Sequence, residues 1–453
     1  MEAATKESRP LFTNQQLCAL IVPLLIEQLL AVAVGMADTM MVSQAGEAAV
    51  SGVSLVDMIN NLIIYLFSAL ATGGAVVTSQ FIGARRIREA GDSAGQLVLL
   101  SLLSGLGILA FCLLCGRPVM RLFFGSITED VMEAGLLYLR ITAVSYPFLA
   151  LYNAGAALFR SVGNSGISMR VSIVMNLINI VGNAIGVLVL HLGVAGVALP
   201  TLISRAVAAF LILRAAEHGA GPVQLHLRGL RLRGHMVRRI LEIGVPSAVE
   251  NGLFQLGRLL VVSIIATFGT AQIAANAVAN NLDGMAILGG QALGLATITV
   301  VGQCVGAGDY AQARRYNRKL MLISWLLIAA SVVVILTSLP LLLNLYNISD
   351  EARVLSAQLV RLHNIPAIAL WCLSFTLPNT LRAAGDARFT MVVSIVSMAV
   401  FRIGFSVVLG IWMGMGAIGV WIAMDIDWVC RVICFVARYF SGAWTRKYQN
   451  YQA

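Results

Sequence analysis

Asp38 is the first residue in the chain whose position needs a chemical explanation. The stretch Leu17–Val34 before it is nearly all apolar, interrupted mainly by Glu27. An ionised acid in the middle of a membrane helix costs about 2.5–3.5 kcal/mol on insertion scales. Asp38 therefore lies near water at the outer interface, is neutral, or holds a cation. Because burial disfavours a charged carboxylate and a nearby cation favours it, the group is suited to binding and releasing either a proton or a metal cation.

Three asparagines share one face of another apolar segment. Asn176, Asn179 and Asn183 are spaced by three and four residues in the stretch MNLINIVGN, which places them on one side of a helix. Amide oxygens are neutral ligands of the kind that hard cations accept, which includes Na⁺ by extension. The same pattern is typical of hydrogen bonds between packed membrane helices. The residues alone leave both interpretations open.

Four further acids lie within apolar segments. Glu27 and Glu250 each follow a proline by four residues, and Asp57 and Asp283 each have an asparagine three residues away. Acids inside membrane segments usually face a cavity or a partner. We therefore expect these four, together with Asn176, to line a substrate cleft and attract cationic compounds. For the glutamates, hydrogen bonding near a proline kink is an equally good explanation.

The second half of the chain also carries buried charges of both signs. Arg258, Arg402, Asp425 and Asp427 lie in its apolar segments. Buried arginine usually pairs with a carboxylate, so we expect ion pairs between these segments. Asp427 and Arg431 are also spaced to pair along one helix.

The segments that position these residues belong to a strongly apolar chain. Of 453 residues, 59% are hydrophobic and 11% are charged, against about 25% charged in ordinary soluble domains. The mean hydropathy is +0.86. Since a helix needs about 20 apolar residues to cross the bilayer, we predict an all-α membrane protein with about twelve transmembrane helices. The predicted spans lie near residues 17–42, 53–79, 94–115, 134–159, 167–190, 194–214, 240–266, 275–304, 318–343, 357–381, 389–410 and 415–438.

Basic residues gather on one side of these spans. The net charge of +10 comes largely from short clusters between alternate spans, as in cytoplasmic loops. This placement argues against nucleic-acid binding. It predicts a multi-pass protein of the cell (inner or plasma) membrane with both termini in the cytoplasm, which requires an even number of spans.

The two halves of the chain repeat each other. At an offset of 223 residues, Pro23 aligns with Pro246 and Glu27 with Glu250. At the same offset, SQFIGA at 79–84 aligns with GQCVGA at 302–307. Six spans per repeat give both copies the same orientation, so they should be related by an axis along the membrane normal with a central cleft between them. We predict an N-terminal lobe at 1–214, a cytoplasmic connection at 215–238 and a C-terminal lobe at 239–453.

Several motifs of other protein classes are missing from the sequence. There is no convergent His/Glu, Ser/Lys or metal-ligand pattern of an enzyme, and no GxxxxGK[ST] loop of a primary pump. The CxxC at Cys112 and Cys115 lies in an aliphatic span without a second pair, which is typical of apolar filling. We expect no enzyme activity and no cofactor, only Na⁺ or H⁺ as a coupling ion.

The motifs taken in order resemble those of one family. The stretch ADTMMVSQAGEAAVSG at 37–52 resembles the first-span signature of multidrug and toxic compound extrusion (MATE) transporters. LFRSVGNSGISM at 158–169 and LRAAGDARFTM at 381–391 resemble the R-x-x-G-[DN] loop that follows the fourth span of each half in that family. The resemblance covers almost the whole chain. It implies two six-helix lobes in a V and the export of amphipathic, often cationic compounds driven by inward Na⁺ or H⁺.

The resemblance also implies a set of coupling residues. In family members with a Na⁺ site, an Asp of the first span joins an Asn and an acid four residues apart in the fifth span and a Thr in the sixth. These positions correspond to Asp38, Asn179, Asn183 and Thr201, with Asp38, Asn179 and Asn183 as the candidate Na⁺ ligands. Because the second acid is an asparagine here, the site has one formal charge. That change should weaken Na⁺ binding and favour a proton or a site elsewhere.

The predicted function is secondary active efflux by alternating access. The expected partners are small organic cations or other amphipathic compounds and the lipid bilayer, and the expected state is a monomer. A flippase for lipid-linked saccharides of the same wider superfamily is the alternative, and it would be expected to have a more basic central cavity. A membrane-embedded enzyme is less favoured.

Overall fold

The computed structural model describes residues 10–42, 47–125, 128–219, 223, 225, 232–346 and 348–446, and in these residues it is helical without strands. The first half forms α1 (Asn14–Val42), α2 (Glu47–Gly83), α3 (Ile87–Phe124), α4 (Glu129–Val144), α5 (Tyr146–Ser161), α6 (Ser165–Ala184) with its π-helical continuation η2 (Ile185–Val189), and α7 (Ala195–Glu217). The second half forms α8 (Gly234–Ala266), α9 (Thr270–Ala286), α10 (Leu288–Gly306), α11 (Tyr310–Asn344), α12 (Asp350–Trp371), η3 (Cys372–Thr376), α13 (Leu377–Ala383), α14 (Ala387–Ser397), η4 (Met398–Gly404), η5 (Ser406–Trp412) and α15 (Gly416–Phe440). Most of the predicted connection at 215–238 lies outside the described residues.

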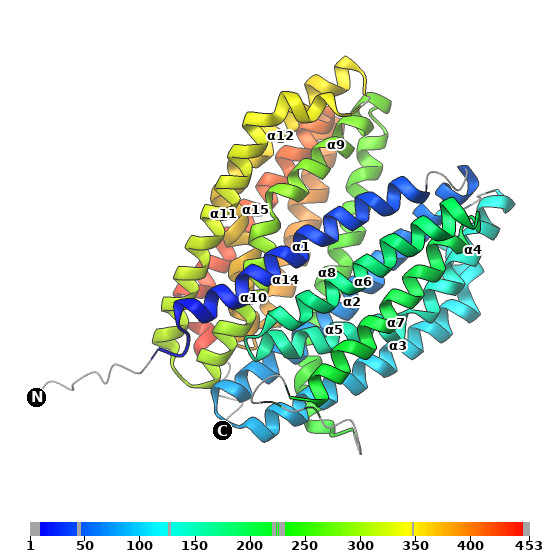
Figure 1. Ribbon diagram of the computed structural model, residues 1–453. Helices are drawn as coiled ribbons and strands as arrows, with labels where there is room; N and C mark the ends of the chain where they lie inside the picture. Colours follow the sequence, from blue (N-terminus) through cyan, green and yellow to red (C-terminus); the bar gives the residue numbers. More distant parts are fainter. Residues whose placement is uncertain are drawn as a thin grey trace, which may run out of the picture.

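The helices form two bundles, α1–α7 and α8–α15, that diverge from a shared end (Figure 1). One large hydrophobic core consists mainly of second-half residues, and two smaller cores consist mainly of first-half residues. Both ends of the described chain pack at the start of α11. Phe12 contacts Tyr316 there, and Trp444 contacts Tyr310. The prediction of an all-α protein with two lobes is therefore confirmed.

The span count needs one qualification of composition. Within the described residues, ten helices are long and apolar enough to cross a membrane, and α4–α5, bent by 45°, makes an eleventh if the pair counts as one span. Helix α15 has 25 residues, but its middle carries Asp425, Asp427 and Arg431, so its composition alone does not mark it as a span. With α15 included, the helices reach the predicted count of about twelve.

The repeated motifs meet where the two lobes touch. Gln80 Nε2 donates a hydrogen bond to the carbonyl oxygen of Ala383 at 2.8 Å, and Gln303 Nε2 donates to that of Ser161 at 2.7 Å. Gln80 aligns with Gln303, and Ser161 aligns with Ala383, in the internal repeat. The two bonds are therefore symmetry equivalents that cross between the lobes in opposite directions. This exchange supports a pseudo-two-fold axis through the contact.

Two glycines allow this close approach. A Cβ on Gly306 would lie 1.9 Å from the carbonyl oxygen of Gln80, and one on Gly83 would lie 1.9 Å from that of Gln303. Real Cβ atoms do not come this close to backbone, so any side chain here forces the lobes apart. Small residues have this role wherever membrane helices must touch backbone to backbone.

A Gly306→Ala variant is therefore expected to export slowly. Overpacking a tight contact costs roughly 1–3 kcal/mol, which lowers the population of the closed contact by about tenfold or more. The initial rate of ethidium efflux from cells measures the effect. Gly107→Ala on α3 is the matched control, because nothing lies within 4 Å of a Cβ built there. Efflux by Gly306→Ala at the rate of that control would contradict the proposed role of the contact.

Candidate functional site

The four residues predicted to couple transport to an ion lie together in the first lobe. Asn183 Nδ2 donates a hydrogen bond to Asp38 Oδ1 at 2.8 Å and a longer one to Asn179 Oδ1 at 3.3 Å. Asn179 Nδ2 donates to Thr201 Oγ1 at 3.0 Å. A continuous chain of hydrogen bonds therefore joins α1, α6 and α7.

Close helix packing brings these side chains into reach. A Cβ on Gly186 would lie 2.4 Å from the carbonyl oxygen of Gly196, and one on Gly182 would lie 2.6 Å from Pro200. These small residues let α6 and η2 lie directly against α7. The two asparagines stand one turn apart in the last turns of α6, just before the π-helical stretch. Such π-helical insertions often occur at functional sites.

The oxygen atoms of this cluster suit a small hard cation or a proton. Asp38 supplies a carboxylate, and Asn179, Asn183 and Thr201 supply neutral oxygens. Asn183 Oδ1 is buried and has no hydrogen-bond partner among the described residues. A buried acceptor without a partner costs about 1–3 kcal/mol. The cluster therefore contains one acceptor that a bound cation, or a proton on the acid, would satisfy.

Asp57 lies in a neighbouring network of the same lobe. Asn60 Nδ2 and the Tyr138 hydroxyl both donate to Asp57 Oδ1, at 3.0 and 3.2 Å. Tyr146 donates its hydroxyl to Asn60 Oδ1 at 2.6 Å. The pairing of Asp57 with the asparagine one turn later could be expected from their spacing. The tyrosines could not, because they lie far away in the sequence and tyrosine occurs widely in apolar spans.

Glu27 and Glu250 have equivalent surroundings in the two lobes. Ser168 donates a hydrogen bond to Glu27 Oε1 at 2.6 Å, and its repeat equivalent Thr390 donates to Glu250 Oε2 at 3.4 Å. Arg382, the arginine of the second R-x-x-G-[DN] loop, also lies 2.7 Å from Glu250 Oε2. The charge of Glu250 is thus balanced within the protein in this arrangement. That these glutamates attract cargo stays a prediction.

The other two residues predicted for the cleft have separate surroundings. Asn176 donates to Ser172 on its own helix at 3.3 Å and is not part of the hydrogen-bond chain to Asp38. Asp283 does not pair with Asn280, which instead donates to Asn276 Oδ1 at 2.9 Å. Asp283 lies near His363, with 4.0 Å between Oδ1 and the histidine Nε2.

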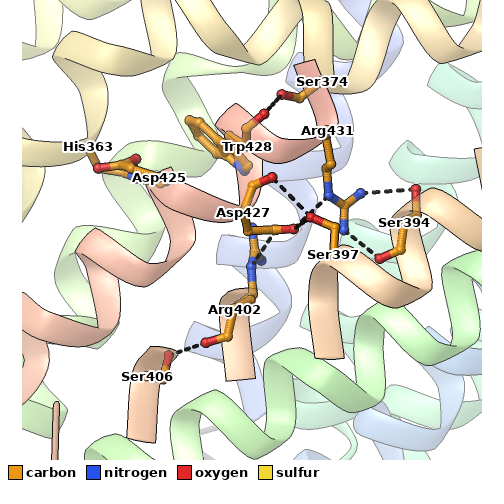
Figure 2. A network of polar contacts seen from close by, with 10 residues as sticks. All are labelled: His363, Ser374, Ser394, Ser397, Arg402, Ser406, Asp425, Asp427, Trp428 and Arg431. Atoms are coloured by element: carbon orange, nitrogen blue, oxygen red, sulfur yellow. Dashed lines mark hydrogen bonds and ion pairs between the residues drawn. The ribbon is translucent and has the colours of Figure 1, made fainter. Parts of the chain in front are cut away.

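A buried ion-pair network occupies the second lobe (Figure 2). Asp427 Oδ2 lies 3.0 Å from Arg402 Nε, and Asp427 Oδ1 lies 3.0 Å from Arg431 Nε. The expected pairing between segments is therefore observed for Arg402, and the expected pair along one helix is observed for Arg431. Asp425 pairs differently, because His363 Nδ1 lies 2.6 Å from its Oδ1. The sequence analysis did not identify His363, since a single histidine in an apolar helix gives no spacing signal.

A cavity of about 490 Å³ lies between α2, α3 and α4 of the first lobe and α8 of the second. Its lining is mostly aliphatic and aromatic, including Phe111 and Phe123, and contains the polar side chains of Asn61, Gln255 and Arg258. Among the described residues that line it, Arg258 is the one charged side chain, so the cavity is not the basic one expected of a flippase. The acids predicted for the cleft do not line this cavity.

The fold and its buried polar groups define a class of protein. Two bundles of long apolar helices, related by an internal repeat and carrying polar clusters inside the bundles, are the architecture of duplicated membrane transporters. A family model described as MatE matches residues 23–185 and 246–408, two segments offset by the same 223 residues as the internal repeat. The chain belongs to the MatE family. It is a multi-span membrane transporter and not an enzyme, and the resemblance drawn from its motifs is confirmed.

Known proteins resemble the chain along nearly its full length. An uncharacterized transporter of Bacillus subtilis, YisQ, is 29% identical and is covered to 98%, as is this chain. The probable multidrug resistance protein NorM of Thermotoga maritima is 23% identical over 96% of this chain and 94% of its own. A multidrug resistance MATE family transporter solved in an outward-facing conformation has a TM-score of 0.89 at 22% identity, over 95% of this chain and 96% of that one. This structural likeness shows the fold.

Proposed function

We propose that this protein is a secondary antiporter that exports amphipathic, mostly cationic organic compounds across the cell membrane in exchange for inward Na⁺ or H⁺. The observation that carries the proposal is the hydrogen-bond chain from Asp38 through Asn183 and Asn179 to Thr201. It gathers one carboxylate and several neutral oxygens from three helices at one point. The printed names of the relatives, which describe multidrug resistance proteins, support drug export.

Asn183 gives the proposed site two compatible states. Its amide N–H now points at Asp38, which satisfies an ionised carboxylate without a cation. Rotation of the amide would present Oδ1 instead, either to a cation beside Asp38 or to a proton on that acid. An amide serves both states because it carries donors and an acceptor. A carboxylate at this position would repel Asp38 whenever the cation is absent.

Exchange between these states can be coupled to movement of the lobes. An ion that binds one arrangement of α1, α6 and α7 better than the other shifts the balance between them, by as much as its two affinities differ. Cargo that favours the other arrangement gives antiport. The apolar cavity between the lobes suits the hydrophobic part of such cargo, since ligand pockets are mostly apolar with a few polar groups.

Transport in proteoliposomes under one imposed gradient at a time tests the coupling ion. We expect a pH gradient to drive ethidium transport by the parental protein, because Asp38 is the one acid in the described hydrogen-bond chain. We expect Asn183→Asp to increase the response to a Na⁺ gradient, because it adds a second negative charge for the cation. If neither gradient drives transport by the parental protein, the antiport proposal is wrong.

A further inference from the structure

A second group of titratable residues lies in the other lobe, apart from the cluster around Asp38. The His363 side chain, on α12, is 2% exposed. Its Nδ1 lies 2.6 Å from Asp425 Oδ1 on α15, and its Nε2 lies 4.0 Å from Asp283 Oδ1 on α9. The imidazole therefore stands between carboxylates from two other helices. Figure 2 shows His363 beside Asp425, across α15 from the pairs of Asp427.

The protons of this group do not balance if the imidazole is neutral. A neutral imidazole has a single N–H, and the short contact to Asp425 uses it when that proton is on Nδ1. The lone pair of Nε2 then faces Asp283 Oδ1, which is buried and has no hydrogen-bond partner among the described residues. Two acceptors that face each other away from water are unfavourable. One added proton turns this contact into a charge-assisted hydrogen bond and halves the negative charge of the group from two to one.

The surrounding groups limit where that proton can reside. The other charged side chains whose fields reach Asp283 are Arg258 and Arg402. Arg402 already pairs with Asp427, which also binds Arg431. Of the remaining elements packed on α12, α11 carries its charged residues within 314–319, near its start, and η3 carries none. Arg361 on α12 itself is exposed.

The rings of Trp421 and Trp428 complete the enclosure of the imidazole. Their centroids lie 4.9 and 4.2 Å from that of His363. The side chains of Asp283 and Asp425 are each 16% exposed, in contrast to the nearly buried histidine. A proton from water would therefore reach the imidazole by way of a carboxylate.

We propose that His363, Asp283 and Asp425 form a second ion-binding site, which binds one proton between His363 Nε2 and Asp283. The proton comes from water, adds to the imidazole and returns to water when the three helices separate, so no bond other than N–H is made or broken. Protonation ties α9 to α12, while α12 stays tied to α15. The role of this proton in transport rests on the proposed antiport, whereas its binding does not.

The two tryptophans provide a direct readout of proton binding. A protonated imidazole quenches neighbouring indole fluorescence, so the purified full-length protein should show a transition when its tryptophan emission is titrated with pH. We expect His363→Gln to abolish the transition. We expect Asp283→Asn to move its midpoint to lower pH by about one unit, because a nearby carboxylate stabilises the imidazolium. The exposed His235 at the start of α8 allows a matched control, His235→Gln, which should leave the transition unchanged.

The outcomes separate this site from the one around Asp38. A transition that persists in His363→Gln, or a midpoint that Asp283→Asn does not move, overturns the proposal. If His363→Gln aggregates on size-exclusion chromatography, the midpoint of Asp283→Asn decides. Failure of the antiport itself would appear differently, as transport that responds to neither gradient while the fluorescence transition of the parental protein remains. In proteoliposomes, His363→Gln should move fewer protons per ethidium than the parental protein, and an unchanged ratio would show that the site does not take part in coupling.

Discussion

An Asp38→Asn variant is expected to fold and insert normally but to export ethidium at less than about one tenth of the parental rate. Asparagine has the same size and can still accept the hydrogen bond from Asn183 Nδ2, so the packing of α1 against α6 should survive. It cannot take up a proton or balance a cation. Coupling free energies between sites are typically about 1–3 kcal/mol, or 5- to 150-fold, and this variant removes the coupling. Efflux from cells at matched protein levels measures the loss.

The same substitution at an exposed aspartate provides the control for Asp38. Asp130, in the first turn of α4, is exposed, so Asp130→Asn should export at the parental rate. A monodisperse peak in detergent would show that the Asp38→Asn protein is folded. Parental export by that protein would remove Asp38 from the coupling mechanism.

Loss of Asp427 is expected to have the largest effect on folding. The carboxylate is fully buried and is the ion-pair partner of Arg402 and Arg431, and it also accepts a hydrogen bond from Ser397. Asp427→Ala leaves both guanidiniums buried without a counter-charge. Removing one partner of a buried ion pair costs roughly 3–5 kcal/mol. We expect a large drop in the melting temperature and in the yield of monodisperse protein.

A surface ion pair provides the comparison for Asp427. Asp350 lies 3.2 Å from Arg353, but its side chain is 96% exposed. Exposed pairs contribute about 0–1 kcal/mol, so Asp350→Ala should change the melting temperature little. Equal melting temperatures for the two variants would show that the network around Asp427 does not stabilise the second lobe.

The positions of the helices could be predicted from the sequence because the bilayer constrains them. Apolar runs of sufficient length must be helical to satisfy their backbone hydrogen bonds in lipid, and this rule located the spans without any knowledge of packing. Helix α15 is the informative exception. Its charges remove it from a search by composition, yet they are neutralised by side chains of other helices.

The cluster around Asp38 was predictable in part. Helical spacing placed Asn179 and Asn183 on one face, and the family resemblance added Asp38 and Thr201. Spacing alone could not bring α1 to that face. The close contacts of Gly182, Gly186 and Gly196 with their neighbours do so, and they depend on three-dimensional packing.

The sequence by itself determined the class of this protein: its helices, its duplication at an offset of 223 residues and its family all follow from local hydropathy and from motifs repeated along the chain. Only the tertiary structure decided which polar residues are partners. Asp57 binds Tyr138, Glu250 pairs with Arg382, and His363 stands between Asp425 and Asp283. These partners come from different helices, and the partner of a buried charge is set by how helices pack, which the periodicity of a single helix does not encode.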